Sequence, residues 1–268
     1  MGYNPPVRIL ITNDDGIHSE GVRVLQEVAS RFGDSVVVAP DRDRSGIGQA
    51  ISLSKPLRLR EARGYPGRAY ALEGGTPADC VYVGLHHVMK GETPDLVLSG
   101  INPGANLGWD VLYSGTAAGA RESVLHGIPG IAFSLLGSST RQFPFEMVTD
   151  WIAQVIESAR PLPEHTFLNV NIPNPLVGPI AGIRPTRLGH RYYSKEVVLR
   201  TDPRGGEYLW IGGEHVSMPD IVGSDCNAVR EGWVSVTPLG CDSTDLVTLD
   251  ALSSRFPVRK SAHIATSE

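Results

Sequence analysis

Short apolar runs alternate with a helical pattern and with polar loops in the first part of the chain. Residues 7–11 predict a buried strand, and residues 35–39 predict a second one. Between them, residues 21–32 place apolar side chains at helical spacing. A strand, a helix and a strand in this order imply a right-handed crossover between parallel strands. We therefore expect an α/β fold built on a mostly parallel sheet with helices packed against it.

Later segments continue this alternation. The predicted strands are residues 95–99, 128–134 and 166–172, and the predicted helices are residues 116–126 and 145–159. Residues 51–60 and 68–72 are rich in β-forming residues on either side of a Gly/Pro turn, which predicts a hairpin or an edge pair. Thr76, Pro77 and Asp79 form a good helix start, and capping accounts for that motif without a functional role.

The character of the sequence changes at residue 175. Residues 175–223 are rich in Gly, Pro and Arg, with short β-like pieces and no convincing helix. This composition predicts an extended β-hairpin arm that lies largely outside the core and contacts another subunit. A strand over residues 232–237 and a short helix over residues 246–256 are expected to follow. We predict one domain over residues 1–268, with a core at about 7–172, an arm at about 185–223 and a C-terminal segment at about 224–268.

Composition excludes several classes of protein. The chain has 268 residues, of which 41% are hydrophobic and 20% charged, and this suits a globular domain. A net charge of -5 gives no reason to expect a stable nucleic-acid complex or binding to an anionic membrane. The first six residues do not resemble a signal peptide and no window is apolar over ~18 residues, so we expect a cytoplasmic location. The three cysteines are far apart and suggest neither disulfides nor zinc.

Polar residues follow three of the predicted strands. Asp14 and Asp15 come after the first strand, Ser45 lies in the loop after the second, and Asn102 follows residues 95–99. The carboxyl ends of parallel strands meet at one edge, where ligands usually bind. Adjacent carboxylates raise each other's pKa unless a cation lies between them, and a hard divalent metal would remove that conflict. Taken alone, residues 13–16 also fit an ordinary polar turn.

Residues 100–115 form a loop rich in Gly and Asn that leads into a helix. Ser114, Gly115 and Thr116 offer backbone N–H groups, hydroxyls and the positive end of a helix dipole, which together suit a phosphate. Ordinary helix capping is the alternative interpretation of these residues.

Together these segments resemble one family. The runs ILITNDDG, VVVAPDRDRSG, GGTPADCV, PDLVLSGINPGANLGWDVLYSGT and WVSVTPL are similar, in order and spacing, to the SurE family of metal-dependent 5'-nucleotidases. The resemblance extends from residue 7 to about residue 240. It implies a Rossmann-like three-layer core, a protruding hairpin and a C-terminal segment exchanged between subunits.

The resemblance also implies functional residues. The implied ligands of a divalent cation, Mg²⁺ or Mn²⁺, are Asp14, Asp15, Ser45 and Asn102. Of these, Asp14, Asp15 and Asn102 are the implied catalytic residues. The implied phosphate contacts are Asn106, Ser114, Gly115 and Thr116. All four metal ligands are oxygen donors, as these cations prefer.

The implied activity is hydrolysis of nucleoside 5'-monophosphates to nucleoside and phosphate, with 3'-nucleotides and short polyphosphate as further substrates. The implied assembly is a homodimer or homotetramer formed through the arm and the C-terminal segment. A non-catalytic nucleotide-binding α/β module is the alternative. The sequence has no G-x-x-x-x-G-K-[ST] loop and no G-x-S-x-G elbow, which argues against P-loop enzymes and serine hydrolases. Its eight histidines are dispersed, and none is indicated as a base.

Overall fold

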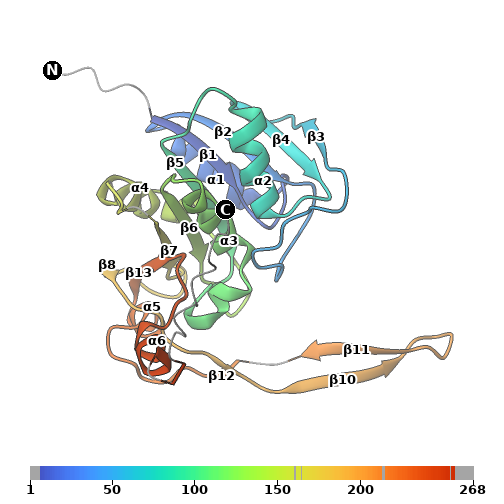
Figure 1. The fold of residues 1–268 in the computed structure, drawn as a ribbon, viewed down its shortest axis with the longest axis vertical. Helices are drawn as coiled ribbons and strands as arrows, with labels where there is room; N and C mark the ends of the chain where they lie inside the picture. The colour runs from blue at the N-terminus through green and yellow to red at the C-terminus, as the bar shows by residue number, and fades with distance from the viewer. Residues whose placement is uncertain (1–6, 160, 164, 213–214, 254, 257–268) are drawn as a thin grey trace, which may run out of the picture.

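A computed structural model describes residues 7–159, 161–163, 165–212, 215–253 and 255–256. These residues form a nine-stranded sheet of order β3-β4-β2-β1-β5-β6-β7-β13-β8 (Figure 1). Its strands are β1 (Val7–Thr12), β2 (Gly33–Pro40), β3 (Arg58–Glu61), β4 (Arg68–Glu73), β5 (Leu96–Pro103), β6 (Gly130–Leu135), β7 (Thr166–Ile172), β8 (Gly182–Pro185) and β13 (Trp233–Gly240). Adjacent strands from β4 to β7 pair in parallel, so the predicted α/β fold with a mostly parallel sheet is confirmed.

Helices cover both faces of the sheet. The helices of the described residues are α1 (Glu20–Ala29), α2 (Pro77–Val83), α3 (Gly115–Leu125), α4 (Thr149–Ser158), α5 (Asp225–Arg230) and α6 (Leu246–Ser253), with a π-helical turn η1 (Gly84–Val88) and 3-10 turns η2 (Gly108–Leu112) and η3 (Phe145–Val148). Ile9 and Ile11 of β1 belong to the same apolar cluster as residues of α1 and α4. Leu10 belongs to the cluster that includes α2. Because β1 is covered on both faces, its apolar run is continuous rather than alternating.

The sheet extends beyond residue 172, where the sequence suggested that the core ends. β13 pairs antiparallel with β7, and β8 pairs in parallel with β13. Val234 is fully buried between them and the helices, so the C-terminal segment contributes to the core. α5 was not expected, because six residues are too few to show helical periodicity.

The expected strand over residues 51–60 is shorter than predicted. β3 includes only Arg58–Glu61 of this range. The preceding backbone bonds to the start of α2 instead: Ser52 N donates to Asp79 Oδ1 at 2.8 Å, and Thr76 Oγ1 donates to the carbonyl of Ala50 at 2.7 Å. The predicted helix start at Thr76 is confirmed, and Thr76 and Asp79 form a capping box there. This cap therefore holds Ala50 and Ser52, near the end of the loop that follows β2.

A hairpin of β10 (Glu196–Thr201) and β11 (Glu207–Gly212) projects from the body of the molecule (Figure 1). At its base, β9 (Tyr192–Tyr193) pairs with β12 (His215–Ser217). The protruding part is shorter than the predicted residues 185–223. Arg187 N donates to the carbonyl of Gly223 at 2.9 Å, so the two ends of the segment are bonded to each other. Gly189 N donates to Asp225 Oδ1 at 2.7 Å, which joins the first end to α5.

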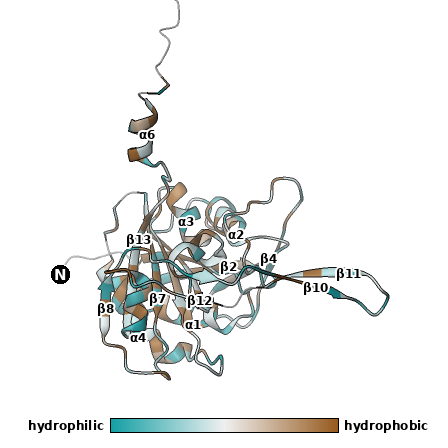
Figure 2. Cartoon of the chain, turned by 90° about the horizontal axis from the view of Figure 1, so that it is seen from below, coloured by the Kyte–Doolittle hydropathy of each residue, from teal (hydrophilic) through white to brown (hydrophobic). Residues whose placement is uncertain are grey.

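The helix α6 stands clear of the sheet (Figure 2). It has no buried residue, although Leu246, Val247 and Leu249 are apolar. The three cysteines are free thiols; Cys80 and Cys226 are buried. In the part of the chain that the structure describes, no helix combines the length and apolarity that a bilayer crossing requires.

Candidate active site

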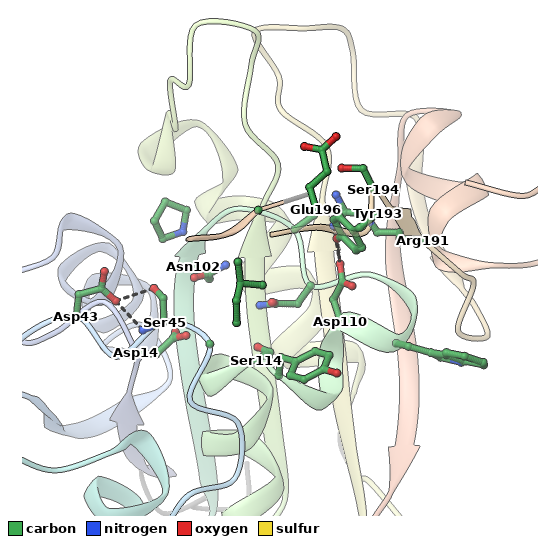
Figure 3. A pocket seen from close by; sticks show the side chains of 18 of the residues that line it. Asp14, Asp43, Ser45, Asn102, Asp110, Ser114, Arg191, Tyr193, Ser194 and Glu196 are labelled. Atoms are coloured by element: carbon green, nitrogen blue, oxygen red, sulfur yellow. Dashed lines mark hydrogen bonds and ion pairs between the residues drawn. The ribbon is translucent and has the colours of Figure 1, made fainter. Parts of the chain in front are cut away.

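A cavity of about 1040 Å³ opens at the carboxyl ends of the central strands (Figure 3). It is lined by residues from all three loops that the sequence analysis placed at this edge. Of the predicted site residues, those that line it are Asp14, Asp15, Ser45, Asn102, Asn106 and Ser114. Gly115 and Thr116 lie behind this surface, at the start of α3. The parallel order of β2, β1 and β5 brings these loops together.

Asp14 and Asp15 are held in a poorly solvated place. Asp14 is only 4% exposed, and burial raises its pKa, although a hydrogen bond from Thr116 opposes the shift. Burial, followed by the charges of Asp14 and Asp43, raises the pKa of Asp15 to about 8. Asp43 is therefore a third carboxylate of the site, which the sequence analysis did not single out. The charge of Asp43 thus disfavours the ionised forms of Asp14 and Asp15, and the charge of Asp14 also disfavours that of Asp15.

Asp43 also orients Ser45. The backbone N and Oγ of Ser45 both donate to Asp43 Oδ1, at 2.7 and 2.6 Å (Figure 3). Because the hydroxyl proton is used in this bond, the lone pairs of Ser45 Oγ remain available. Asn102 Nδ2 donates to the carbonyl of Gly104 at 2.8 Å, which likewise leaves the amide oxygen available. Both side chains are thus arranged as oxygen donors.

The residues present fit a hard divalent cation. Asp15 Oδ2 is buried and has no hydrogen-bond partner among the described residues, and buried polar atoms are normally satisfied. Nowhere in the described ranges do three or more His, Cys, Asp or Glu side chains gather around a possible ion. A cation here would therefore need Ser45 and Asn102 in addition to the two carboxylates. An all-oxygen set of this kind suits Mg²⁺ or Mn²⁺ better than zinc.

The start of α3 approaches Asp14 closely. A Cβ on Gly115 would lie 2.7 Å from Asp14 Cβ, so only glycine permits this packing. Ser114 caps the helix, since its Oγ accepts from Ala117 N at 3.0 Å. The capping alternative therefore applies to the Ser114 side chain. The remaining N–H groups of the first turn and the positive end of the dipole still lie beside the cavity.

Thr116 differs from the expectation of a direct phosphate contact through its hydroxyl. The residue is fully buried, and its Oγ1 donates to Asp14 Oδ1 at 2.7 Å. Thr116 does not line the cavity, so its hydroxyl is directed to the carboxylate and not to the open space. Thr116 therefore positions Asp14.

Asn106 is fixed by a buried polar network. Its backbone N donates to Asn171 Oδ1 at 2.8 Å, and its carbonyl accepts from Asn169 and Asn171 Nδ2 at 2.8 and 3.0 Å. Its own Nδ2 donates to Ser134 Oγ at 2.9 Å. Such a network holds the amide in one orientation before any ligand binds. Asn169 and Asn171 are two residues apart on β7 and therefore point to the same face of the sheet. Two asparagines at this spacing in an otherwise apolar strand are the sequence pattern that could have indicated them.

The base of the arm forms another wall of the cavity. Arg191 Nη1 pairs with Asp110 Oδ2 at 2.7 Å, and the hydroxyl of Tyr193 donates to the same oxygen (Figure 3). Lys195 also lines the cavity. These residues were not predicted, because the arm was expected to lie outside the core. The arm and the active-site cavity are thus linked through Asp110.

Comparisons with known proteins agree with this geometry. Residues 9–195 match the family model described as survival protein SurE. The 5'-nucleotidase SurE of Myxococcus xanthus is 48% identical over 258 residues, covering 93% of this chain and 94% of that protein. The 5'-nucleotidase SurE of Syntrophotalea carbinolica is 46% identical over 248 residues, covering 91% and 96%.

A solved structure extends the likeness to the fold. The crystal structure of the SurE protein from Aquifex aeolicus superposes with a TM-score of 0.79 at 40% identity, covering 92% of this chain and 99% of that one. The family model, the relatives and the superposed structure all point to the same conclusion: this chain belongs to the SurE family.

Proposed function

We propose that this chain is a divalent-metal-dependent phosphatase that hydrolyses nucleoside 5'-monophosphates to nucleoside and phosphate. The relatives named 5'-nucleotidase SurE support this substrate class. The observation that carries the proposal is the meeting, in one cavity, of the Asp14–Asp15 carboxylates with the N-terminus of α3. A cation site beside an anion site is what transfer of a phosphoryl group requires.

Asp14, Asp15, Ser45 and Asn102 are the residues that would hold the cation, and Mg²⁺ or Mn²⁺ fits their oxygen donors. When bound, it would polarise a phosphoryl oxygen and lower the pKa of a water molecule. Thr116 keeps Asp14 oriented through its 2.7 Å hydrogen bond. The hydrogen bond from Ser45 Oγ to Asp43 likewise keeps the hydroxyl of Ser45 oriented, with its lone pairs available to the cation.

The first turn of α3 would hold the phosphoryl oxygens. The Asn106 Nδ2 donates to Ser134 Oγ and to Thr116 Oγ1 at 3.3 Å, and it would join them by exchanging the longer of these bonds for one to a phosphoryl oxygen. Backbone N–H groups at a helix start favour an anion, and their fixed positions cost no reorganisation during the reaction. Asn106 owes its fixed position to Asn171 and Ser134. Because these groups recognise a phosphoryl group alone, 3'-nucleotides and short polyphosphate belong to the same proposal.

The assay that tests this proposal is phosphate release from a panel of nucleoside monophosphates, with and without EDTA. We expect release with Mg²⁺ or Mn²⁺, loss of release with EDTA, and recovery after excess metal is added. A protein that binds nucleotide tightly but releases no phosphate with any divalent metal would instead be the non-catalytic binding module. The paired carboxylates argue against that alternative, since they would repel a bound phosphate in the absence of a cation.

We also propose that copies of this chain assemble through the arm and the C-terminal segment as a homodimer or homotetramer. Leu209, Trp210 and Ile211 of β11 are 64%, 62% and 93% exposed, and α6 buries none of its residues. Apolar surface of this kind normally marks an interaction site. Light scattering coupled to size exclusion measures the mass, and a monomer at micromolar concentration would contradict the proposal.

A further inference from the structure

Two histidines that are forty residues apart meet on the surface formed by η1 and α3. His86 Nε2 lies 3.3 Å from His126 Nδ1. Neither residue lines the active-site cavity. His126 is the C-cap residue of α3, the helix whose N-terminus faces that cavity, so the two ends lie roughly 16 Å apart. The pair therefore forms a separate cluster.

A carboxylate orients one ring of the pair. His126 Nε2 lies 3.2 Å from Glu122 Oε1, and the Glu122 side chain is 8% exposed. Glu122 is itself held, because Gln49 Nε2 donates to its Oε2 at 2.6 Å. When His126 Nε2 carries the proton and donates to Glu122, the lone pair of Nδ1 faces His86. A carboxylate behind the second ring nitrogen is the usual arrangement around a metal-binding histidine.

The spacing of the two nitrogens also suits a shared ion. Two imidazole nitrogens on one tetrahedral zinc, each at ~2.0–2.1 Å, lie about 3.3 Å apart. The Tyr82 ring covers the pair, with its centroid 4.6 Å from the His86 ring and 5.5 Å from the His126 ring. His86 is exposed and His126 is partly exposed, so water reaches the remaining coordination positions.

We propose that His86 and His126 form a second metal site, which takes a borderline divalent transition metal such as Zn²⁺, Ni²⁺ or Cu²⁺. Imidazole nitrogens favour these ions, whereas the oxygen donors around Asp14 and Asp15 favour Mg²⁺ or Mn²⁺. The chain thus carries two sites of different selectivity, one at each end of α3. In the described residues, no third His, Cys, Asp or Glu completes this site, so water fills the other positions.

The test is copper binding by the untagged full-length protein in excess Mg²⁺, which keeps the oxygen site occupied. One equivalent of Cu²⁺ is added, and electron paramagnetic resonance reports nitrogen ligands through their hyperfine splitting. We expect coupling to two imidazole nitrogens in the wild type. His86→Ala and His126→Ala should each lose that signal and weaken binding at least about tenfold. This test does not depend on phosphatase activity.

His87→Ala is the matched control, because His87 is an exposed neighbour in the same turn and has no part in the pair. It should bind copper like the wild type. Glu122→Gln should weaken binding by roughly tenfold to a hundredfold, as expected when a partner behind a metal ligand is changed. If His86→Ala keeps the two-nitrogen signal, or if His87→Ala loses it, the site does not exist as proposed.

Discussion

The floor of the active-site cavity, formed by Asp14, Thr116 and Asn171, buries polar side chains, whereas the β10–β11 hairpin exposes apolar ones. At the floor, Asp14, Thr116 and Asn171 are buried although they are polar. On the hairpin, Leu199, Leu209 and Ile211 are exposed although they are apolar. Each arrangement costs free energy in the isolated chain. Thr116 and Asn171 are satisfied by hydrogen bonds to Asp14 and Asn106. Under the proposal above, a cation would offset the cost of burying Asp14, and a second copy of the chain would cover the hairpin.

The largest expected effect comes from removing a charge at the floor. Asp14→Asn keeps the shape of the side chain and an oxygen that accepts from Thr116, but it removes half of the anionic charge of the adjacent pair. We expect phosphatase activity to fall below detection and Mg²⁺ affinity, measured by calorimetry, to fall with it. The metal-free variant should be at least as stable as the metal-free wild type, because a buried charge has been removed.

Asp34→Asn, at an exposed position of β2, is the control and should change neither property. Near-normal turnover of Asp14→Asn at low metal would show that the floor is not built for a cation.

The proposed role of the hairpin in assembly is tested by the double variant Leu199→Ser, Leu209→Ser. These two residues face each other across β10 and β11. We expect the assembly to dissociate, which light scattering would show as a lower mass. The thermal midpoint of the separated chain should stay close to that of the core, because exposed substitutions change stability by about 0.5 kcal/mol or less. Arg204→Ser, in the exposed turn of the hairpin, should leave the mass unchanged.

A smaller effect is expected at Thr116. Thr116→Val is nearly isosteric but removes the hydrogen bond to Asp14, and a bond to a charged group contributes about 1.5–3 kcal/mol. If that loss appears in the transition state, kcat/KM should fall by roughly tenfold to a hundredfold, chiefly through kcat. Thr116→Ser restores the hydroxyl and should recover most of the rate. A lowered thermal midpoint with unchanged kcat in the Val variant would assign Thr116 to helix packing alone.

The last expected effect is on the stability of the metal-free protein against pH and not on catalysis. The pKa of Asp15 is raised from 3.8 to about 8, chiefly by burial, so the folded state binds a proton that the unfolded state releases. The favourable contribution of protonated Asp15 is complete below pH ~4 and is lost as pH rises through about 8. Urea midpoints in EDTA should therefore decline across this window. Mg²⁺ should remove the decline, and Asp15→Asn should reduce it to the part that Asp14, whose pKa is also raised by burial, contributes. A decline unchanged in Asp15→Asn would place its origin elsewhere.

Local patterns were sufficient for most of the fold. Strands buried on both faces are continuous apolar runs, and α1 and α4 show helical spacing, so most elements of residues 7–172 could be predicted. Residues 51–57 are the exception, because they form no strand. The loops after β1, β2 and β5 could be placed at one edge because parallel strands share a direction. What local pattern could not supply was the entry of β13 and β8 into the sheet, since pairing between distant strands depends on which edge is left open after β7 is placed.

The sequence by itself determined the α/β architecture and the helix start at Ser114, because each is encoded in residues close together along the chain. The candidate oxygen ligands came from the resemblance of its motifs to the SurE family. Only the tertiary structure decided that Thr116 faces Asp14, that Asp110 is joined to Arg191 of the arm, and that His86 meets His126. These contacts join residues up to about a hundred positions apart. Their geometry depends on how closely the packed elements approach one another, as the contact of Gly115 with Asp14 illustrates. The distance between two elements cannot be predicted from the residue pattern within either of them.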